Sequence, residues 1–366
     1  MSEDLQTPQP TQGFIPGIRK LTPYWHPYTT MAKERWLGRE ILEVVSTEFR
    51  DRSMEYYKYA LESGVTSING RPAKPDTIIR NGDRIENVVH RHEPPITSTP
   101  VKIILHDGQR GFLVINKPGS IPVHATGRYY HHSLVQILRN DFGFDKVYTI
   151  NRLDRLTSGL MIVPLNADLA RSLSAEFVNG SVHKEYIARC KGEFPVDEVV
   201  CEEPLLTVDR QMGLNIVHPE GKASCPAKTV FNRIRYDSNT HTTVVRCIVF
   251  WFPSHQIRVH LQYLGYPIAN DPIYSEERIW GPNLGKGGVD IIPSALVRLP
   301  TMEASEPAVD PDTGTLYCPE CYLPLHPDPR PENLYIFLHA FKYTTSLGCF
   351  ETEMPEWASE GWEWTR

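Results

Sequence analysis

The feature that most constrains the fold is a proline-rich break near residue 100, within the run HRHEPPITSTP at positions 90–100. Proline lacks a backbone N–H and fixes one backbone angle, so such a run continues neither a helix nor a central strand. The whole chain has 366 residues, which is more than one typical domain needs. The sequence therefore predicts a small N-terminal module at 21–99 and a larger domain at 100–348.

The larger domain has the pattern of an α+β fold. Short apolar runs with the character of strands alternate with amphipathic stretches, and long loops separate them. A proline-dense insertion is expected near 300–331, and an acidic tail is expected at 349–366. The predicted strands are 101–105, 112–116, 160–164, 185–189 and 242–250, and the predicted helices are 133–139, 167–178 and 255–264.

The N-terminal part begins with residues 1–20, which are rich in proline, glutamine and threonine and offer almost nothing to bury, so a flexible arm is expected. Two amphipathic helices are predicted between residues 35 and 70, because apolar residues recur there at helical spacing. Asn-Gly pairs at 69–70 and 81–82 predict tight turns. Short strands are predicted at 77–80 and 83–88.

This order of two helices and a hairpin, with SINGRPAKPDTIIRNGDRI at 67–85, resembles the small alpha-L RNA-binding motif of several RNA-modifying enzymes. The resemblance implies that Arg71, Lys74 and Arg80 contact RNA phosphates, which positions RNA without reading its sequence. A solvated hairpin edge that carries basic residues for solubility explains the same three residues equally well.

Charge and cysteine content limit the possible functions. The net charge is -6, which opposes phosphate binding unless basic residues gather in one groove. The seven cysteines are odd in number and mostly scattered, so no disulfide framework is expected. The N-terminus has neither the blocks of a signal peptide nor the acid-poor composition of a transit peptide, and no apolar run reaches membrane-spanning length. A cytoplasmic or nuclear protein without a membrane segment is therefore predicted.

The most informative string is INRLDRLTSGLMIV at 150–163, where a charged loop runs directly into an apolar strand. Arg152, Asp154 and Arg155 place one carboxylate between two guanidinium groups, which keeps a carboxylate ionised and directs it. These are the requirements of a carboxylate nucleophile. A structural bridge that ties the loop to the sheet is the commoner role of such a string taken alone.

Two further polar clusters follow this loop. The strand run SVHKEYIARC at 181–190 contains Lys184 and Tyr186, and the helical run HQIRVHLQYLGYPIANDPIY at 255–274 opens with His255, Gln256 and Arg258. Arg258 lies about one turn after His255, so both can share a helix face. An arginine on a half-buried face needs a carboxylate partner.

The three strings, with FLVINKPGSIPVH at 112–124 and FLHAFKY at 337–343, resemble the RluA-type family of pseudouridine synthases in order and separation. The resemblance covers about residues 110–345. It implies a pseudouridine synthase fold with a mixed, mainly antiparallel sheet flanked by helices and long loops. The segment before residue 50 and the phrase HRHEPP resemble the eukaryotic branch, which includes enzymes that modify the tRNA anticodon loop.

Carried over by position, the resemblance makes Asp154 the nucleophile, Arg258 its partner, Tyr186 the stacking residue and Arg152 a catalytic-site arginine. It implies an RNA substrate, most plausibly tRNA, with no cofactor and a monomeric enzyme. A uridine must leave the RNA stack to be isomerised, so base flipping is expected. The sequence does not decide whether Asp154 attacks the ribose or the uracil ring. The further candidates for RNA contact are Lys117, Arg155, Lys184, His255 and Gln256.

Departures from the family pattern leave an alternative open. Asn151 stands where the family usually has histidine, and Phe252, Pro253 and Ser254 stand where it usually has Gly-Arg-Thr or similar. A non-catalytic RNA-binding or chaperone protein that retains the fold is therefore the second hypothesis. A hydrolase is disfavoured, because no obvious second carboxylate is present to activate water.

The pair Cys318 and Cys321 has the spacing of half a zinc knuckle, and His326 could add a third ligand. No second C-x-x-C exists in the sequence, and Cys349 is remote. The prediction is therefore a loop with two free thiols and no metal, with a zinc-organised interaction protein as a third hypothesis.

Overall fold

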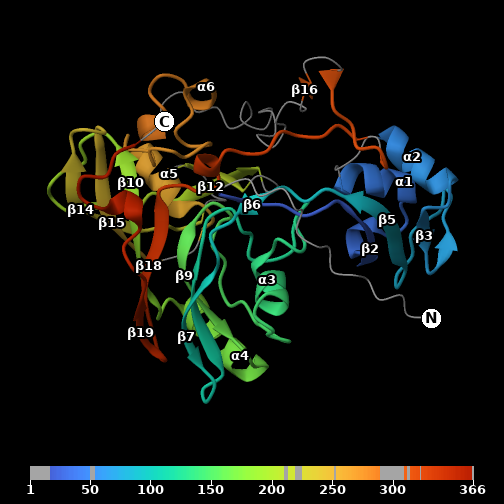
Figure 1. The fold of residues 1–366 in the computed structure, drawn as a ribbon, viewed down its shortest axis with the longest axis horizontal. Coiled ribbons are helices and arrows are strands. Elements are labelled where there is room, and N and C mark those ends of the chain that lie inside the picture. The colour runs from blue at the N-terminus through green and yellow to red at the C-terminus, as the bar shows by residue number, and fades with distance from the viewer. Residues whose placement is uncertain are drawn as a thin grey trace.

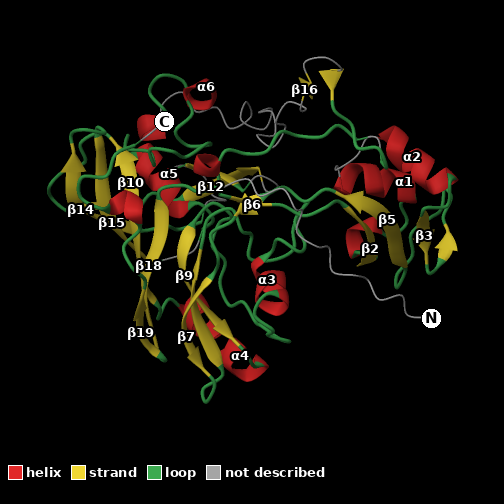
Figure 2. Cartoon of the chain, in the orientation of Figure 1, coloured by secondary structure: helices red, strands yellow, loops and turns green. Residues whose placement is uncertain are grey.

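The computed structural model describes residues 17–49, 54–209, 213–218, 225–250, 253–288, 309–310, 314–321 and 323–364. A large unit built around one sheet and a smaller N-terminal unit lie side by side, joined by extended segments (Figure 1). Strands dominate the large unit, and its helices are few and short (Figure 2). Within the described residues, no helix has the length and apolar character needed to cross a membrane.

The large unit contains a nine-stranded sheet among the described residues. Its strand order is β11-β14-β15-β10-β18-β9-β8-β7, with β19 paired to β18. The strands are β7 (Lys102–Asp107), β8 (Phe112–Lys117), β9 (Ser158–Pro164), β10 (His183–Lys191), β11 (Val199–Cys201), β14 (Thr229–Asp237), β15 (Thr242–Val249), β18 (Leu338–Thr345) and β19 (Gly348–Glu351).

One seam divides this sheet. The pairing of β18 with β9 is parallel, with Ala340 opposite Gly159, whereas the other described pairs in the sheet are antiparallel. Gly159 has φ +121°, and a Cβ there would lie 2.3 Å from the carbonyl oxygen of Ala340, so the close approach at the seam requires glycine. The sheet is thus mixed and mainly antiparallel, which confirms the predicted fold class.

Separate apolar cores lie on the two sides of the seam. The first packs α3 (Leu134–Asn140) and α4 (Ala167–Asn179) against β8 and β9. The second packs α5 (Gln256–Tyr263) against β10 and β15. A hairpin of β12 (Leu205–Asp209) and β13 (Leu214–Val217), followed later by α6 (Glu277–Trp280), forms a third cluster beside α5. The seam therefore brings loops from both halves of the sheet together.

The N-terminal unit is a four-stranded sheet with its own apolar core. The strand order is β2-β5-β3-β4, and the turn between β3 and β4 has positive φ at both Asn69 and Gly70, as a tight hairpin turn requires. Its elements are β2 (Tyr24–Met31), η1 (Glu34–Trp36), α1 (Ile41–Val44), η2 (Val45–Phe49), α2 (Met54–Glu62), β3 (Thr66–Ile68), β4 (Arg71–Pro72) and β5 (Arg84–Arg91).

The predicted elements of the large unit lie where the sequence placed them, with ends that differ by a few residues. The elements predicted for the N-terminal unit agree less closely with the structure. The first of the two helices expected at 35–70 is broken into η1, α1 and η2, whereas the second is present as α2. The strand expected at 77–80 is a loop with an isolated bridge at Ile78. Gly38 has φ +78°, which interrupts the helix after η1 and before α1.

Both predicted chain ends need correction. Ile18 is buried in β1 (Ile18–Arg19), which pairs with β6 (Ile96–Thr97), so the expected flexible arm does not extend to residue 20. The expected acidic tail is not separate, because β19 continues the main sheet and Trp357 packs into its core. Residues 1–16, Phe252 and the parts of the expected insertion at 300–308, 311–313 and 322 lie outside the described residues. The remaining short elements are β16 (Val309–Asp310), β17 (Gly314–Thr315), η3 (Lys286–Gly288), η4 (Pro331–Asn333) and η5 (Glu356–Ala358).

Candidate active site

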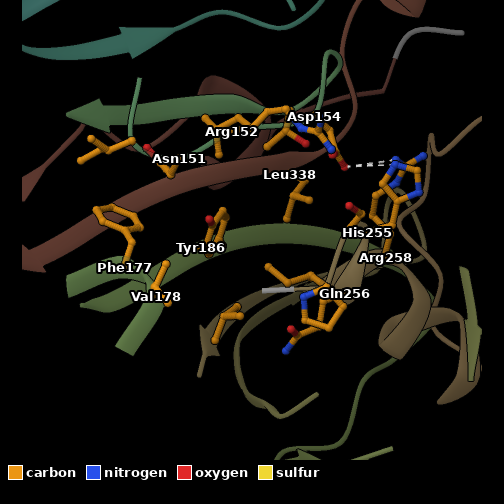
Figure 3. A pocket seen from close by; sticks show the side chains of 17 residues that line it. Asn151, Arg152, Asp154, Phe177, Val178, Tyr186, His255, Gln256, Arg258 and Leu338 are labelled. Carbon is orange, nitrogen blue, oxygen red and sulfur yellow. Dashed lines mark hydrogen bonds and ion pairs between the residues drawn. The ribbon is translucent and has the colours of Figure 1, made fainter. Parts of the chain in front are cut away.

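A pocket of about 350 Å³ opens at the seam of the sheet (Figure 3). Its volume is at the lower end of the range for small-ligand sites, which is roughly 300–1,000 Å³. Asp154 and Arg152 come from the loop before β9, Tyr186 from β10, and Arg258 from α5. The structure therefore brings the four predicted catalytic residues to one cavity. Other lining residues include Asn151, Phe177, Val178, His255, Gln256 and Leu338.

The loop that carries Asp154 is fastened to the sheet beside it. The Lys117 ammonium, at the end of β8, donates to the carbonyl oxygens of Pro118 and Ile121 at 2.9 Å each and to that of Arg155 at 3.4 Å. The Asp154 side chain remains 25% exposed to the pocket. The loop thus presents one accessible carboxylate on an anchored backbone.

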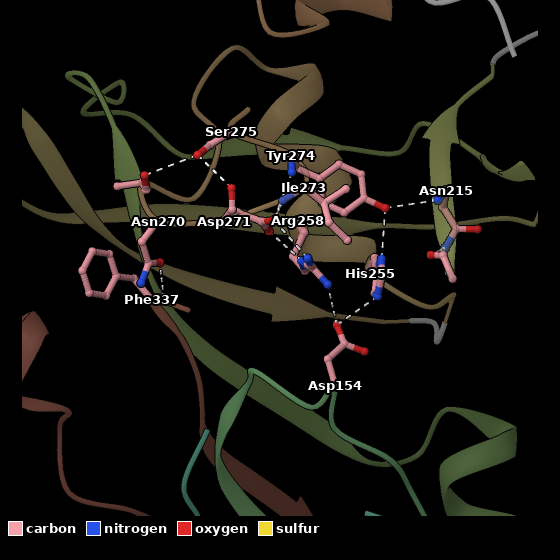
Figure 4. A network of polar contacts seen from close by, with 12 residues as sticks. Asp154, Asn215, His255, Arg258, Asn270, Asp271, Ile273, Tyr274, Ser275 and Phe337 are labelled. Atoms are coloured by element: carbon pink, nitrogen blue, oxygen red, sulfur yellow. Dashed lines mark hydrogen bonds and ion pairs between the residues drawn. The ribbon is translucent and has the colours of Figure 1, made fainter. Parts of the chain in front are cut away.

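Asp154 faces two basic groups from the start of α5. Its Oδ2 atom lies 3.3 Å from Arg258 Nη1 and 3.5 Å from His255 Nε2 (Figure 4). His255 has φ +60°, an uncommon conformation for a residue other than glycine. In this conformation His255 is the N-cap of α5, and the side chains of His255 and Arg258 both point at the Asp154 carboxylate.

The main partner of Arg258 is Asp271, which the sequence analysis did not single out. Arg258 donates through Nε to Asp271 Oδ2 at 2.6 Å and through Nη2 to Oδ1 at 3.0 Å, a bidentate pair that is shorter than its contact with Asp154. Asp271 also accepts the backbone N–H groups of Ile273 and Tyr274. The predicted contact of Arg258 with Asp154 is therefore longer than its contact with Asp271. Asp271 lies in the same sequence string, 255–274, as Arg258.

A hydrogen-bonded chain supports His255 from behind (Figure 4). The Tyr274 hydroxyl accepts the backbone N–H of Asn215 at 3.1 Å and lies 3.0 Å from His255 Nδ1. If the hydroxyl donates to Nδ1, a neutral imidazole carries its proton on Nε2, which is directed at Asp154. No sequence signal pointed to Asn215, since it comes from β13, a strand that was not predicted.

The protonation states follow from burial and charge. Burial by itself would raise the pKa of Asp154, but His255, Arg258 and Arg152 together hold this pKa below its ordinary value. Burial and the charge of Arg258 lower the pKa of His255 to about 4. At neutral pH the imidazole is therefore uncharged, and Arg258 is the buried cation that stabilises ionised Asp154.

Tyr186 forms another part of the pocket wall (Figure 3). A β-bulge between Glu185 and Tyr186 shifts the register of β10 against β18, which re-aims the side chain. The Tyr186 hydroxyl lies 2.8 Å from that of Tyr343, a fully buried residue. Burial raises the pKa of Tyr186 to about 12, so the phenol stays protonated at neutral pH.

Two predicted RNA contacts are wrong. Lys117 has no exposed surface, and its ammonium is used by three backbone carbonyls. Lys184 is 1% exposed, and burial lowers its pKa to about 7. Neither side chain is placed to contact an RNA phosphate, because both are buried in strands that have few or no exposed residues. The presence of a lysine in a sequence motif does not show whether its side chain is buried or exposed.

The other predicted RNA contacts are placed differently. Arg152 is exposed at the pocket, and Arg155 is half-buried with its guanidinium over the ring of Tyr129. Gln256 lines the pocket but is 4% exposed, and its amide nitrogen donates to Lys228 and Thr229. Arg71, Lys74 and Arg80 are exposed on the N-terminal unit. Their contacts with RNA remain predictions.

A separate cluster surrounds the cysteine pair, whose two thiols are not joined by a disulfide. Cys318 and Cys321 lie with His90 and His92, and one ligand atom from each of the four lies within 4.8 Å of the others. The sequence analysis did not place an H-x-H pair, 228 positions earlier in the chain, beside these cysteines. Within the described residues, His326 is not part of this group.

Comparison with known proteins now identifies the family. Residues 111–263 match the family model for RNA pseudouridylate synthase. The tRNA pseudouridine(32) synthase, mitochondrial, of Saccharomyces cerevisiae is 43% identical over 360 residues, covering 93% of this chain and 77% of the relative. The chain belongs to the RNA pseudouridylate synthase family. The human pseudouridylate synthase RPUSD2 is 34% identical, covering 96% of this chain and 75% of the relative.

Membership of this family confirms the resemblance to pseudouridine synthases and makes the chain an RNA pseudouridine synthase, an isomerase with an RNA substrate. A solved structure described as human RNA Pseudouridylate Synthase Domain Containing 1 has 20% identity and a TM-score of 0.48, covering 70% of this chain and 84% of its own. The predicted cytoplasmic or nuclear location is contradicted, because the yeast relative is named a mitochondrial enzyme. An N-terminal composition test detects only obvious targeting segments.

Proposed function

We propose that this pseudouridine synthase acts on the anticodon stem-loop of tRNA and uses Asp154 as the nucleophile on a flipped-out uridine. The observation that carries the proposal is the pocket at the seam, where Asp154 is the exposed carboxylate and a buried guanidinium faces it. The name of the yeast relative supports the choice of tRNA, since position 32 belongs to the anticodon loop. The same name supports a mitochondrial place of action.

The pocket residues divide the work between them. Arg258 keeps Asp154 ionised and aimed, while Asp271 holds Arg258 in place through its bidentate pair. Tyr186 offers an aromatic face on which the extruded base stacks. Arg152, exposed at the pocket, holds the displaced strand by its phosphate. Extrusion costs roughly a few kcal/mol, and a loop nucleotide with weak pairing reduces that cost.

The bonds balance without an external reagent. Asp154 attacks either the anomeric carbon or the uracil ring. On both routes the bond between the anomeric carbon and N1 of the base breaks. The base then turns within the pocket and its C5 bonds to the anomeric carbon. The bond to Asp154 breaks and returns its electron pair to the carboxylate, and the proton on C5 is lost as N1 gains one. Ionised Asp154 is required on either route, because a protonated carboxyl is a poor nucleophile.

Hydrolysis is not supported by this geometry. A hydrolase needs a second carboxylate to activate water, and Asp271 is the other carboxylate in the network around Asp154. The Asp271 side chain has no exposed surface, and its oxygens already accept from Arg258, Ile273 and Tyr274. Asp271 therefore acts as a positioning residue.

The N-terminal unit supplies the second part of the RNA surface. Arg71, Lys74 and Arg80 are exposed around its β3–β4 hairpin and the following loop, which suits contacts with phosphates. These three basic residues stand beside the exposed Asp76, on a chain whose net charge is -6. We propose that a single protomer grips the tRNA body through this unit while the loop enters the pocket.

The decisive experiment replaces Asp154 with asparagine and measures pseudouridine formation in tRNA transcripts. The expected result is a fall in the rate by about a thousandfold or more, with tRNA affinity retained. Asp145→Asn is the matched control, because Asp145 is exposed on the same loop. Full conversion by Asp154→Asn would refute the assignment of the nucleophile, whereas RNA binding without conversion by the unmodified protein would favour the chaperone alternative.

A further inference from the structure

Four metal-binding side chains meet where the N-terminal unit contacts a C-terminal segment. His92 Nε2 lies 3.1 Å from His90 Nδ1 and 3.2 Å from Cys321 Sγ, and Cys318 Sγ lies 3.5 Å from His90 Nδ1. His90 and Cys318 are 3% and 4% exposed. We call these four residues the His–Cys cluster.

Each half of the cluster is formed by local structure. His90 lies in β5 and His92 follows its end, so the two rings, two positions apart, share one face of the strand. Cys318 and Cys321 occupy a turn closed by backbone bonds from Cys318 N to Leu323 O at 2.9 Å and from Leu325 N to Leu316 O at 2.8 Å. That turn resembles a zinc knuckle in its spacing and its closure.

The separations between the ligand atoms suit a tetrahedral ion. Zinc, with bonds of about 2.0–2.1 Å to nitrogen and about 2.3 Å to sulfur, separates its ligand atoms by roughly 3.3–3.8 Å. The three measured contacts, at 3.1, 3.2 and 3.5 Å, are close to this range. The widest pair in the group is still within 4.8 Å. Small side-chain rotations therefore bring all four atoms onto one tetrahedron.

The surroundings of the cluster also fit a metal site. The other ring nitrogen of His90, Nε2, lies 3.4 Å from Glu320 Oε2. Trp25 Nε1 donates to the same oxygen at 3.1 Å, and its ring packs on His90 at 4.8 Å. A carboxylate behind a liganding imidazole is the usual outer partner, since it fixes the ring orientation and raises the basicity of the ligand.

We propose that His90, His92, Cys318 and Cys321 bind one structural zinc ion that ties β5 to the C-terminal segment. Two thiolates and two imidazoles are the ligands that zinc prefers, and four protein ligands leave no open position for catalysis. The segment runs on to β18 in the main sheet, so the ion adds a connection between the N-terminal unit and the unit that holds the pocket, besides contacts such as Arg91 with the carbonyl of Gly127. This inference does not depend on the role proposed for Asp154.

Metal analysis of the full-length protein, purified with a reductant and without chelator, tests the proposal. The expected content is one zinc per chain, and the cobalt-substituted protein should show the visible absorption of tetrahedral thiolate-bound cobalt. Cys321→Ser should lose most of the zinc and lower the midpoint of thermal unfolding. Cys349→Ser is the matched control, because Cys349 is an exposed free cysteine outside the cluster, and it should retain the metal.

A second variant keeps the test decisive if Cys321→Ser does not fold. His92→Cys replaces one zinc ligand with another and should retain about one zinc per chain. Absence of zinc from the unmodified protein, or a disulfide between Cys318 and Cys321 in its place, would overturn the proposal. Equal zinc loss in Cys349→Ser would also overturn it. Each readout is independent of pseudouridine formation, so failure of the proposed function would leave it unchanged.

Discussion

Two buried polar sites join distant parts of this chain, and their chemistry differs. The carboxylate network at the seam contains Asp154, His255, Arg258, Asp271 and Tyr274, and the His–Cys cluster joins the N-terminal unit to the C-terminal segment. In the network, donors and acceptors alternate, so each charge has its partner. In the cluster, four groups with lone pairs converge on one point.

This difference teaches how to recognise an ion site from side chains alone. A network in which a guanidinium separates two carboxylates satisfies itself and needs no ion. Imidazoles and thiols that face one another have too few protons to form hydrogen bonds between every pair. A metal cation can accept a lone pair from each of them at once. Substitutions in the network and in the cluster should therefore differ in size and in kind.

The largest effect is expected from Asp271→Asn, because it removes the bidentate partner of a buried arginine. The free energy of unfolding should fall by about 3–5 kcal/mol, and the turnover number should fall because Arg258 is no longer held against Asp154. Urea denaturation and single-turnover kinetics measure the two effects. Asp168→Asn, at an exposed ion pair on α4, is the control and should change little. Equal losses in both variants would show that the network is not the self-satisfied unit described above.

A smaller effect is expected from acid through His255. Its pKa is lowered from 6.5 to about 4 in the folded protein, so the unfolded chain binds this proton first as the pH falls. The contribution of neutral His255 to stability is complete above about pH 6.5 and is lost as the pH falls towards 4, by up to about 3 kcal/mol.

Unfolding of the unmodified protein and of His255→Gln at pH 7, 5.5 and 4.5, about the range of the shift, measures this contribution. The stability of the variant relative to the unmodified protein should rise as the pH falls, since the variant has lost that protonation site. A constant difference at all three values would mean that His255 is not held neutral by the network.

A further prediction concerns Lys117, which supports the loop of Asp154 outside the network. Lys117→Met leaves three carbonyl oxygens without their donor and should destabilise the protein by about 1–3 kcal/mol. Because one of these carbonyls belongs to Arg155, the turnover number should fall more than KM changes. Lys102→Met, at an exposed ion pair on the adjacent strand β7, should leave both unchanged. An altered KM with normal turnover would instead indicate a role in RNA binding.

The smallest effect is expected behind the His–Cys cluster. Glu320→Gln replaces the carboxylate behind His90 with a neutral amide. The zinc affinity should fall by about tenfold, which corresponds to about 1.4 kcal/mol. Competition with a chelator of known affinity measures the change. Glu332→Gln, an exposed glutamate outside the cluster, is the control. Unchanged affinity in Glu320→Gln would indicate that this carboxylate does not support the ligand.

Much of the large unit could be predicted from the sequence, because its strands and helices have regular apolar spacing and its motifs run through them. Strand β9 and helix α5 lie close to their predicted positions. The partner of Arg258 was misjudged for a physical reason. Helical phase shows which face Arg258 occupies, but not which carboxylate the fold brings against that face. The burial of Lys117 and the contribution of Asn215 were missed for the same reason.

The family, the α+β class and the four residues expected at the pocket could be predicted from the sequence, since they depend on local patterns and on the order of motifs. The packed fold was needed to show that Asp271 takes the stronger bonds of Arg258 and that His90 and His92 meet the cysteine pair. His90 and Cys318 are 228 positions apart, and Asp271 lies beyond the end of α5, 13 positions after Arg258. Their distances result from packing of the whole fold, which no local pattern of side chains encodes.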